Sequence, residues 1–264
     1  MRLVRPLRAL LILLVLAGGA VRLPAAPPSE ASAQVQAQYR KEEVLIPMRD
    51  GVKLFTAIYT PKDTSRTYPI LLQRTPYSVA PYGPEAYPER LGPSARFQAE
   101  GFIFVYQDVR GRMMSEGTFV NMRPERDAHP KPTDIDEATD TYDTLDWLIH
   151  HVPGNNGKAG QWGISYPGFY AAAGMICGHP ALVAVSPEAP IVDWFTGDDF
   201  HRNGALWLPH AFNFMVNFGR PRPVPTPDGP VPFRHGTSDG YAWFLRLGFT
   251  AATRQFTKDV AFWN

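Results

Sequence analysis

One serine in this sequence stands in a setting that is typical of a nucleophile. Ser165 lies in the run Gly163–Gly168 (GISYPG), between a short strand-like stretch and a segment of small residues that favours a closely packed helix. A sharp, strained turn from strand to helix presents a nucleophilic serine, and small residues beside it keep neighbouring backbone from colliding. The chemistry that follows is attack of the serine hydroxyl on a carbonyl carbon.

The run departs from the general hydrolase motif at one position. The second glycine of that motif stands two residues after the serine, whereas here Pro167 occupies that place and Gly168 follows it. A proline is tolerated in the first turn of a helix, where its missing N–H costs little. The strand-turn-helix interpretation therefore holds, and its alternative is an ordinary glycine and serine turn without chemistry.

Elements that would position this turn can be predicted from patterning. Asp50–Gly51 between two apolar-rich runs predicts a β-hairpin over 41–59. Short β-rich runs over 68–74 and 102–108 predict strands, the second of them buried and parallel, and helical spacing predicts helices over 95–101 and 136–151. Alternating strands and helices indicate an α/β fold with a mixed, mainly parallel sheet and helices on both faces.

Composition and charge exclude some classes of partner. The chain has 264 residues and a net charge of +1, with no basic stripe that would follow a phosphate backbone, so we expect no nucleic acid partner. The single cysteine, Cys177, lies among apolar residues and is interpreted as part of the core. We predict no cofactor. We also predict no metal site, because the acids at 134, 136, 137, 140 and 143 have the spacing of a solvated helix face.

The amino-terminal segment predicts export. Arg2, Arg5 and Arg8 precede an apolar run over 9–17 that suits a signal peptide and is short for a membrane span. We predict a signal peptide over 1–33, cut at an A-x-A site before Gln34, with cuts nearer Ala20 or Ala26 as alternatives. An uncleaved anchor is the competing interpretation. The expected location is periplasmic or secreted, with no stable membrane partner beyond this segment.

Ordered motifs then connect the chain to a known family. From about Lys41 to about Leu208 the sequence resembles the serine hydrolases that comprise cocaine esterase, α-amino-acid ester hydrolases and X-Pro dipeptidyl-peptidases. The motifs that carry the resemblance are Arg74–Tyr77 (RTPY), Gln107–Arg112 (QDVRGR), Ser115–Gly117 (SEG), Asp140–Trp147 (DTYDTLDW), Asn156–Lys158 (NGK), Gly163–Gly168 (GISYPG), Ser186–Pro190 (SPEAP) and Asp193–Phe200 (DWFTGDDF). The resemblance implies an α/β-hydrolase fold, and tyrosine after the serine with glycine at plus three is the family's own pattern.

The resemblance also implies roles for individual residues. Ser165 would form an acyl-enzyme, and the backbone N–H of Tyr166 together with the hydroxyl of Tyr77 would bind the oxyanion. A loop tyrosine packed on the surface is the alternative for Tyr77. Asp199 aligns with an acid that holds a substrate's α-ammonium group in α-amino-acid ester hydrolases, and its alternative is a helix cap. Trp194 is a further candidate for substrate binding.

Other polar residues receive structural roles. Asp108 ends a predicted strand, and we expect a neighbouring arginine, Arg110 or Arg112, to pair with it and fix loops. Triad order in α/β-hydrolases runs Ser, Asp, His, so an acid at this position is too early to be catalytic.

Domain organisation follows from these assignments. We expect an α/β-hydrolase domain over 34–192 and a cap-like helical insertion over 193–264, truncated, with the triad Asp and His beyond residue 264. The candidates within the sequence are His201, His210, His235, Asp228 and Asp239.

The sequence thus predicts a serine hydrolase acting on esters or amides, with α-amino-acid esters or β-lactam-type acyl compounds as first choice. Its partners would be small ester or amide substrates or short peptides. An X-Pro dipeptidyl-peptidase is one alternative. A secreted binding module without a triad, or an inactive fragment that lacks the triad Asp and His, is the other.

Overall fold

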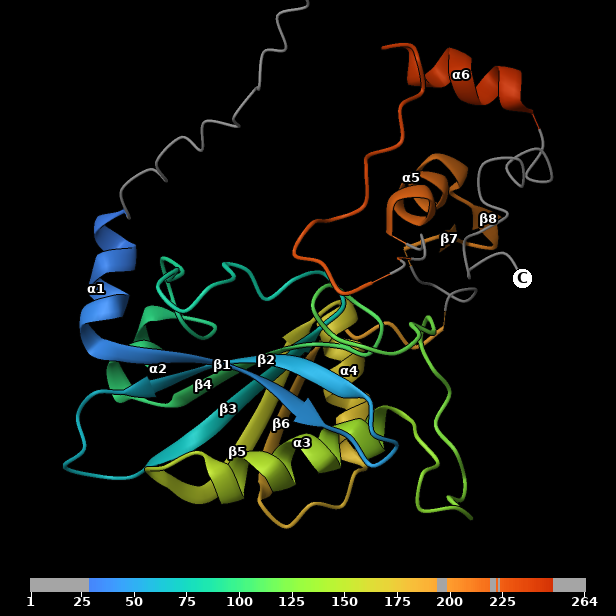
Figure 1. The fold of residues 1–264 in the computed structure, drawn as a ribbon. Coiled ribbons are helices and arrows are strands. Elements are labelled where there is room, and N and C mark those ends of the chain that lie inside the picture. Colours follow the sequence, from blue (N-terminus) through green and yellow to red (C-terminus); the bar gives the residue numbers. More distant parts are fainter. Residues whose placement is uncertain (1–28, 194–198, 219–221, 223, 249–264) are drawn as a thin grey trace, which may run out of the picture.

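A six-stranded sheet forms the centre of the molecule, in a computed structural model that describes residues 29–193, 199–218, 222 and 224–248 (Figure 1). Its strands lie in the order β1-β2-β4-β3-β5-β6. The β1–β2 and β2–β4 pairs are antiparallel and the other three pairs are parallel, so the prediction of a mixed, mainly parallel sheet is confirmed. The strands are β1 (Tyr39–Pro47), β2 (Lys53–Pro61), β3 (Tyr68–Thr75), β4 (Ile103–Asp108), β5 (Asn155–Ile164) and β6 (Leu182–Glu188).

The predicted hairpin joins β1 to β2. Gly51 adopts a φ of 85°, which its lack of a side chain permits, and the amide of Met48 donates to the carbonyl of Val52 at 2.8 Å. This turn sets the register in which Ile46 pairs with Leu54, and both side chains are fully buried.

Helices cover both faces of the sheet, as predicted. Strand alternation sends Ile70 and Leu72 to the face covered by α3 (Glu137–His151), while Leu71 points to the opposite face. On that face, Val35 of α1 (Glu30–Gln38) packs into the core, and α2 (Ala95–Glu100) lies nearby (Figure 1). Helix α4 (Tyr166–Met175) packs beside α3, against β5 and β6.

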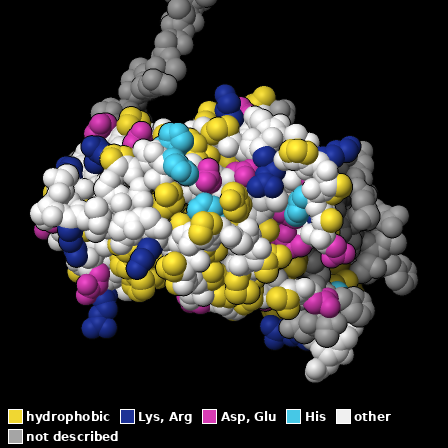
Figure 2. Space-filling view, turned by 90° about the horizontal axis from the view of Figure 1, so that it is seen from below, with side chains coloured by type: hydrophobic (Ala, Val, Ile, Leu, Met, Phe, Trp, Pro, Cys, Tyr) yellow, Lys and Arg dark blue, Asp and Glu magenta, His cyan; other side chains and the backbone are white. Residues whose placement is uncertain are grey.

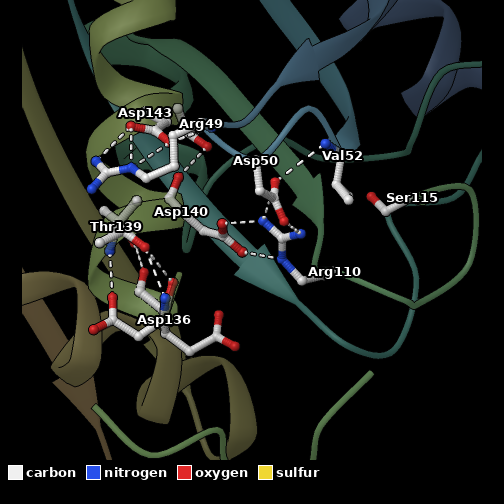
Figure 3. Close-up of polar contacts among 12 residues, drawn as sticks. Arg49, Asp50, Val52, Arg110, Ser115, Asp136, Thr139, Asp140 and Asp143 are labelled. Atoms are coloured by element: carbon white, nitrogen blue, oxygen red, sulfur yellow. Dashed lines mark hydrogen bonds and ion pairs between the residues drawn. The ribbon is translucent and has the colours of Figure 1, made fainter. Parts of the chain in front are cut away.

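Acids that the sequence analysis placed on a solvated helix face are largely buried, and that expectation is wrong. Glu137 and Asp140 of α3 are 3% and 0% exposed. Asp140 lies between two buried arginines: Arg110 donates to both of its carboxylate oxygens, at 2.6 and 3.0 Å, and Arg74 stands 3.6 Å away (Figure 3). Arg110 also binds Asp50 of the hairpin turn at 2.6 Å.

The remaining acids of that group also have protein partners. Asp136 caps α3 by accepting from the amide of Thr139 at 2.8 Å, and Asp143 forms a bidentate pair with Arg49 at the hairpin (Figure 3). Helical spacing of acids reads the same whether water or arginine faces them. In the structure, arginines face Glu137, Asp140 and Asp143.

A second group of elements follows the sheet. It contains β7 (His201–Arg202), β8 (Ala205–Leu206), α5 (Leu208–Phe218) and α6 (Gly240–Leu247), and in Figure 1 it lies above the end of the sheet where α4 begins. Phe218 of α5 packs on Tyr166, the first residue of α4, and Phe214 stacks on Phe218. The predicted domain limits at 34, 192 and 193 stay predictions.

The predicted signal segment falls mostly outside the described residues, which begin at 29. Helix α1 starts at Glu30 and is capped by Ser29, whose hydroxyl accepts from the amide of Ser32 at 3.2 Å. None of the helices in the described part of the chain is long and apolar enough to cross a membrane. On the face seen in Figure 2, charged side chains of both signs are interspersed among hydrophobic patches.

We expect the charge of Asp140 to be a main determinant of stability. Asp140→Asn leaves two buried guanidinium groups short of a carboxylate, and removing one partner of a buried pair costs about 3–5 kcal/mol. Urea unfolding measures the loss. The matched control on the same helix is Asp146→Asn, because the Asp146 side chain is 55% exposed; it should change stability by less than about 0.5 kcal/mol. Equal losses in the two variants would contradict the prediction.

Candidate active site

Ser165 occupies the sharp turn between β5 and α4. Its backbone has a φ of 62° and a ψ of −122°, a conformation that costs a non-glycine residue about 1–3 kcal/mol. The turn is held from both sides, because the Ser165 amide donates to the Glu188 carbonyl of β6 at 2.9 Å and its carbonyl accepts from Phe169 at 3.0 Å. The side chain is partly exposed, and its hydroxyl has no hydrogen-bond partner among the described residues.

Two glycines make this turn possible. A Cβ at Gly163 would stand 2.2 Å from the carbonyl oxygen of Pro167, and one at Gly168 would stand 2.6 Å from the carbonyl oxygen of Glu188. The first contact brings α4 back against β5, and the second brings it against β6. Glycine at plus three, which departs from the general motif, is therefore required by the packing of α4 on β6.

Tyr166 has two separate functions in the geometry. Its backbone N–H opens α4, where amides point out of the helix and the helix dipole favours negative charge. Its side chain is fully buried, and the phenol binds the 119–122 segment by donating to Asn121 and accepting from the amide of Met122 at 2.9 Å. Burial raises the pKa of Tyr166, so the phenol stays neutral.

Tyr77 stands beside Tyr166 at the start of the loop that follows β3. The two rings meet edge to face with centroids 6.3 Å apart. Tyr77 is 42% exposed, and its hydroxyl has no hydrogen-bond partner among the residues that the structure describes. A phenol in this position is available to donate to a bound oxyanion.

The loop over 76–82 is fixed by a carboxylate at the end of β4. Asp108 is fully buried and accepts from the amide of Val79 at 3.1 Å and the phenol of Tyr82 at 2.9 Å. It also accepts from the amide of Met114 at 3.1 Å, which ties this loop to the one after β4. Burial raises the pKa of Asp108 to about 6. The expected structural role for Asp108 thus agrees with its contacts.

The expected partner of Asp108 is wrong. Neither arginine that follows it forms an ion pair with its carboxylate. Arg110 turns to Asp140 and Asp50, and Arg112 donates to two backbone carbonyls. Asp108 instead accepts from amides and a phenol, which stiffens the two loops without an ion pair.

Sequence reasoning also missed Lys41. This lysine on β1 is buried, and its ammonium group donates to the carbonyls of Pro81, Gly83 and Ala86 at 2.6–3.0 Å and pairs with Glu43 at 2.7 Å. It anchors the continuation of the same loop. The sequence did not indicate that Lys41 is buried, because a lysine in a strand of alternating polar and apolar residues normally faces solvent.

The candidates for substrate binding are placed unequally. Asp199 is exposed, and its negative charge contributes to the raised pKa of Tyr77, after burial as the larger cause. The structure therefore brings Asp199 within electrostatic range of Tyr77. Trp194 lies outside the described residues. Phe212 of α5, in the same cap-like segment, is fully buried against Phe233 and Trp243.

The histidine candidates have other surroundings. His210 stacks on Trp207 with centroids 4.8 Å apart, and His235 packs against Trp243 at 4.7 Å. His201 lies on β7. Asp239 caps α6 by accepting from the amide of Ala242 at 2.9 Å, and Asp228 lies in an exposed segment. In the described part of the chain, no hydrogen bond joins Ser165 to a histidine.

A cluster of acidic residues at the start of α3 was also missed in the sequence analysis. Glu125 is half-buried next to Asp136 and Glu137, and burial with the charge of Asp136 raises the pKa of Glu125 to about 8. His129 binds Asp136 at 2.5 Å. Within the described ranges, no group of three or more His, Cys, Asp or Glu is arranged to hold a metal ion.

Strand order, helices on both faces and a serine at the strained turn after β5 define an α/β-hydrolase fold. The chain belongs to the X-Pro dipeptidyl-peptidase (S15) family, which its residues 50–229 match. It is 31% identical over 163 residues to cocaine esterase from Rhodococcus sp. (strain MB1 Bresler), an alignment that covers 62% of this chain and 26% of that protein.

Two solved structures are similar over most of the described chain. An aminopeptidase from a marine sediment archaeon, Thaumarchaeota archaeon, superimposes with a TM-score of 0.72 at 32% identity and covers 93% of this chain. An α-amino acid ester hydrolase superimposes with a TM-score of 0.70 at 33% identity and covers 92%. This chain spans 40% and 38% of those two proteins. The family and the α/β-hydrolase fold predicted from the motifs are confirmed.

We expect the glycine at plus three to be indispensable for the turn. Gly168→Ala places a methyl group against the Glu188 carbonyl, and overpacking of this kind costs about 1–3 kcal/mol. Urea unfolding measures the loss. The control is Gly240→Ala in α6, where nothing lies within 4 Å; it should be neutral or slightly stabilising, because alanine favours helix. A neutral Gly168→Ala would show that α4 does not depend on this contact.

Proposed function

We propose that this protein hydrolyses esters or amides through an acyl-enzyme on Ser165. The observation that carries the proposal is the strained backbone of Ser165 at the start of α4, directly before Tyr166, whose ring contacts that of Tyr77. Strain of this kind is retained where the surrounding structure fixes a residue for function. Membership of a family of hydrolases supports the same conclusion.

The reaction runs in two steps. Ser165 Oγ bonds to the acyl carbon and loses its proton to a base, and the alcohol or amine leaves with a proton. Water then attacks the acyl-enzyme and releases the acid. In both steps the carbonyl oxygen gains negative charge, which the Tyr166 amide and the Tyr77 hydroxyl would bind. Triad order places the base, a histidine, after Ser165 in the chain.

For the acyl group, we propose one that carries a free α-amine. Asp199 lies within electrostatic range of Tyr77, so an ammonium group next to the scissile carbonyl would meet a carboxylate. Two similar proteins are named an aminopeptidase and an α-amino acid ester hydrolase. Esters of α-amino acids, or β-lactam-type acyl compounds with such a side chain, are the first choice, and X-Pro dipeptides are the alternative.

We also propose export to the periplasm or the medium, on the strength of the basic and apolar leader before residue 18. A cut before Gln34 would remove Ser29 and the first turn of α1, whereas a cut near Ala26 keeps this helix whole. Amino-terminal sequencing of the exported protein distinguishes the two sites.

Covalent labelling tests the nucleophile. A fluorophosphonate probe should label the wild-type protein, and Ser165→Ala should abolish labelling. Tyr77→Phe removes one oxyanion donor and should slow ester hydrolysis by about 10²–10³-fold, as loss of such a donor does elsewhere. Ser186→Ala, on the neighbouring strand β6, is the control and should label normally. An unlabelled wild type would favour the alternatives of a binding module or an inactive fragment.

Matched substrates test the α-amine. We expect Asp199→Asn to lower kcat/KM for phenylglycine methyl ester by about 10–100-fold, the worth of a hydrogen bond to a charged group. Phenylacetate methyl ester lacks the amine and should be hydrolysed equally by both forms. Loss on both esters would assign Asp199 a structural role. Faster cleavage of Xaa-Pro anilides than of the amino ester would overturn the ester preference in favour of the dipeptidyl-peptidase.

A further inference from the structure

Arg112 connects the two sides of the candidate site. It lies in the loop after β4 and is only 6% exposed. Its Nε donates to the carbonyl of Pro76 at 2.8 Å, and its Nη1 donates to the carbonyl of Phe218 at 2.7 Å. Pro76 is the residue directly before Tyr77, and Phe218 is the last residue of α5. One guanidinium group therefore joins the loop that carries Tyr77 to α5, whose Phe218 packs on Tyr166, the residue after Ser165.

Ring contacts extend this connection to Tyr77 itself. The guanidinium carbon lies 4.3 Å from the centroid of the Phe218 ring. The Phe218 ring in turn contacts Tyr77 and Tyr166, with centroids 5.4 and 5.5 Å away. Arg112 thus holds Tyr77 through the backbone of Pro76 on one side and through the Phe218 ring on the other.

The surroundings of Arg112 are unfavourable for a residue whose only task is stability. Among the described residues, no carboxylate forms an ion pair with it, and its hydrogen bonds go to neutral carbonyls. A buried charge without an opposite charge is costly. Burial lowers the pKa of Arg112 and the nearby charge of Arg222 lowers it further, while the charge of Asp108, which forms no ion pair with Arg112, offsets only part of this. The two hydrogen bonds and the stacked ring require the planar fork of arginine, which lysine lacks.

We infer that Arg112 is a positioning residue for the oxyanion site, which sets the position of Tyr77 relative to α5. The inference rests on the proposed function. It assigns Arg112 no contact with substrate: the guanidinium acts through Pro76 and Phe218. The position of α5 is thereby coupled to the position of the Tyr77 side chain.

A double-mutant cycle tests whether Arg112 acts through Tyr77. Arg112→Gln should lower kcat for phenylglycine methyl ester about tenfold or more, since small misplacements near the chemistry are costly, and should change KM by less than about twofold. In a Tyr77→Phe background the same change should have little further effect. Arg112→Lys should fall between Arg112→Gln and wild type. Additive losses would show that Arg112 is structural and would overturn the inference.

Arg222 supplies the matched control. It is a partly buried arginine that donates to the carbonyls of Gly111 and Ser115 in the same loop, without reaching Pro76. Arg222→Gln should lower stability but should leave the kcat of the remaining folded protein within about twofold of wild type. A loss equal to that of Arg112→Gln would show that the whole loop, rather than Arg112, positions Tyr77.

Amide hydrogen exchange separates this inference from the proposed function. In Arg112→Gln, exchange should accelerate together at residues 77–80 and at the end of α5, and Arg222→Gln should not produce this pairing. If the wild type neither labels nor hydrolyses esters, the proposed function fails, and paired exchange still supports the link through Arg112. Unchanged exchange in Arg112→Gln would overturn it.

Discussion

Asp140 is the point on which the arrangement of the site depends. It receives Arg110 from the loop after β4 and lies 3.6 Å from Arg74 at the end of β3, while the Arg74 guanidinium also lies over the ring of Tyr170 in α4. The Asp140 carboxylate of α3 therefore links the ends of β3 and β4, and Arg74 extends this link to α4. Such buried pairs add little net stability compared with apolar packing. They do fix the orientation of the side chains, because the guanidinium N–H groups donate in fixed directions.

The turn itself depends on the absence of side chains. Gly163 and Gly168 allow α4 to approach β5 and β6 more closely than any Cβ permits, and this approach lets Ser165 adopt its strained backbone. The loop after β3 then brings Tyr77 to Tyr166, and α5 brings Phe218 to the same place. Rigid strands and close helix packing set the position of the serine, whereas buried Asp108 and Arg112 set the position of what surrounds it.

The sequence predicted the helices and strands better than it predicted which groups contact the buried side chains. Local spacing was enough for the hairpin at Gly51, for β3, β4 and α3, and the ordered motifs singled out Ser165 and Tyr77, whose catalytic roles stay predictions. Asp140 was misjudged because its arginine partners stand 30 and 66 residues away, and helical spacing carries no information about what faces a helix. The same holds for Asp108, whose partners are mostly backbone amides. Amides have no sequence signature, so only the fold reveals them.

In Tyr166 the backbone and the side chain meet different requirements. The peptide N–H that would contact a reacting substrate exists in every residue except proline, so the chemistry leaves the side chain open. The phenol is instead specified by Asn121 and Met122, a segment that precedes the turn by more than forty residues. Changes in that segment would therefore alter acyl transfer without touching a reacting atom, and a library directed at substrate contacts alone would leave such determinants of rate unsampled.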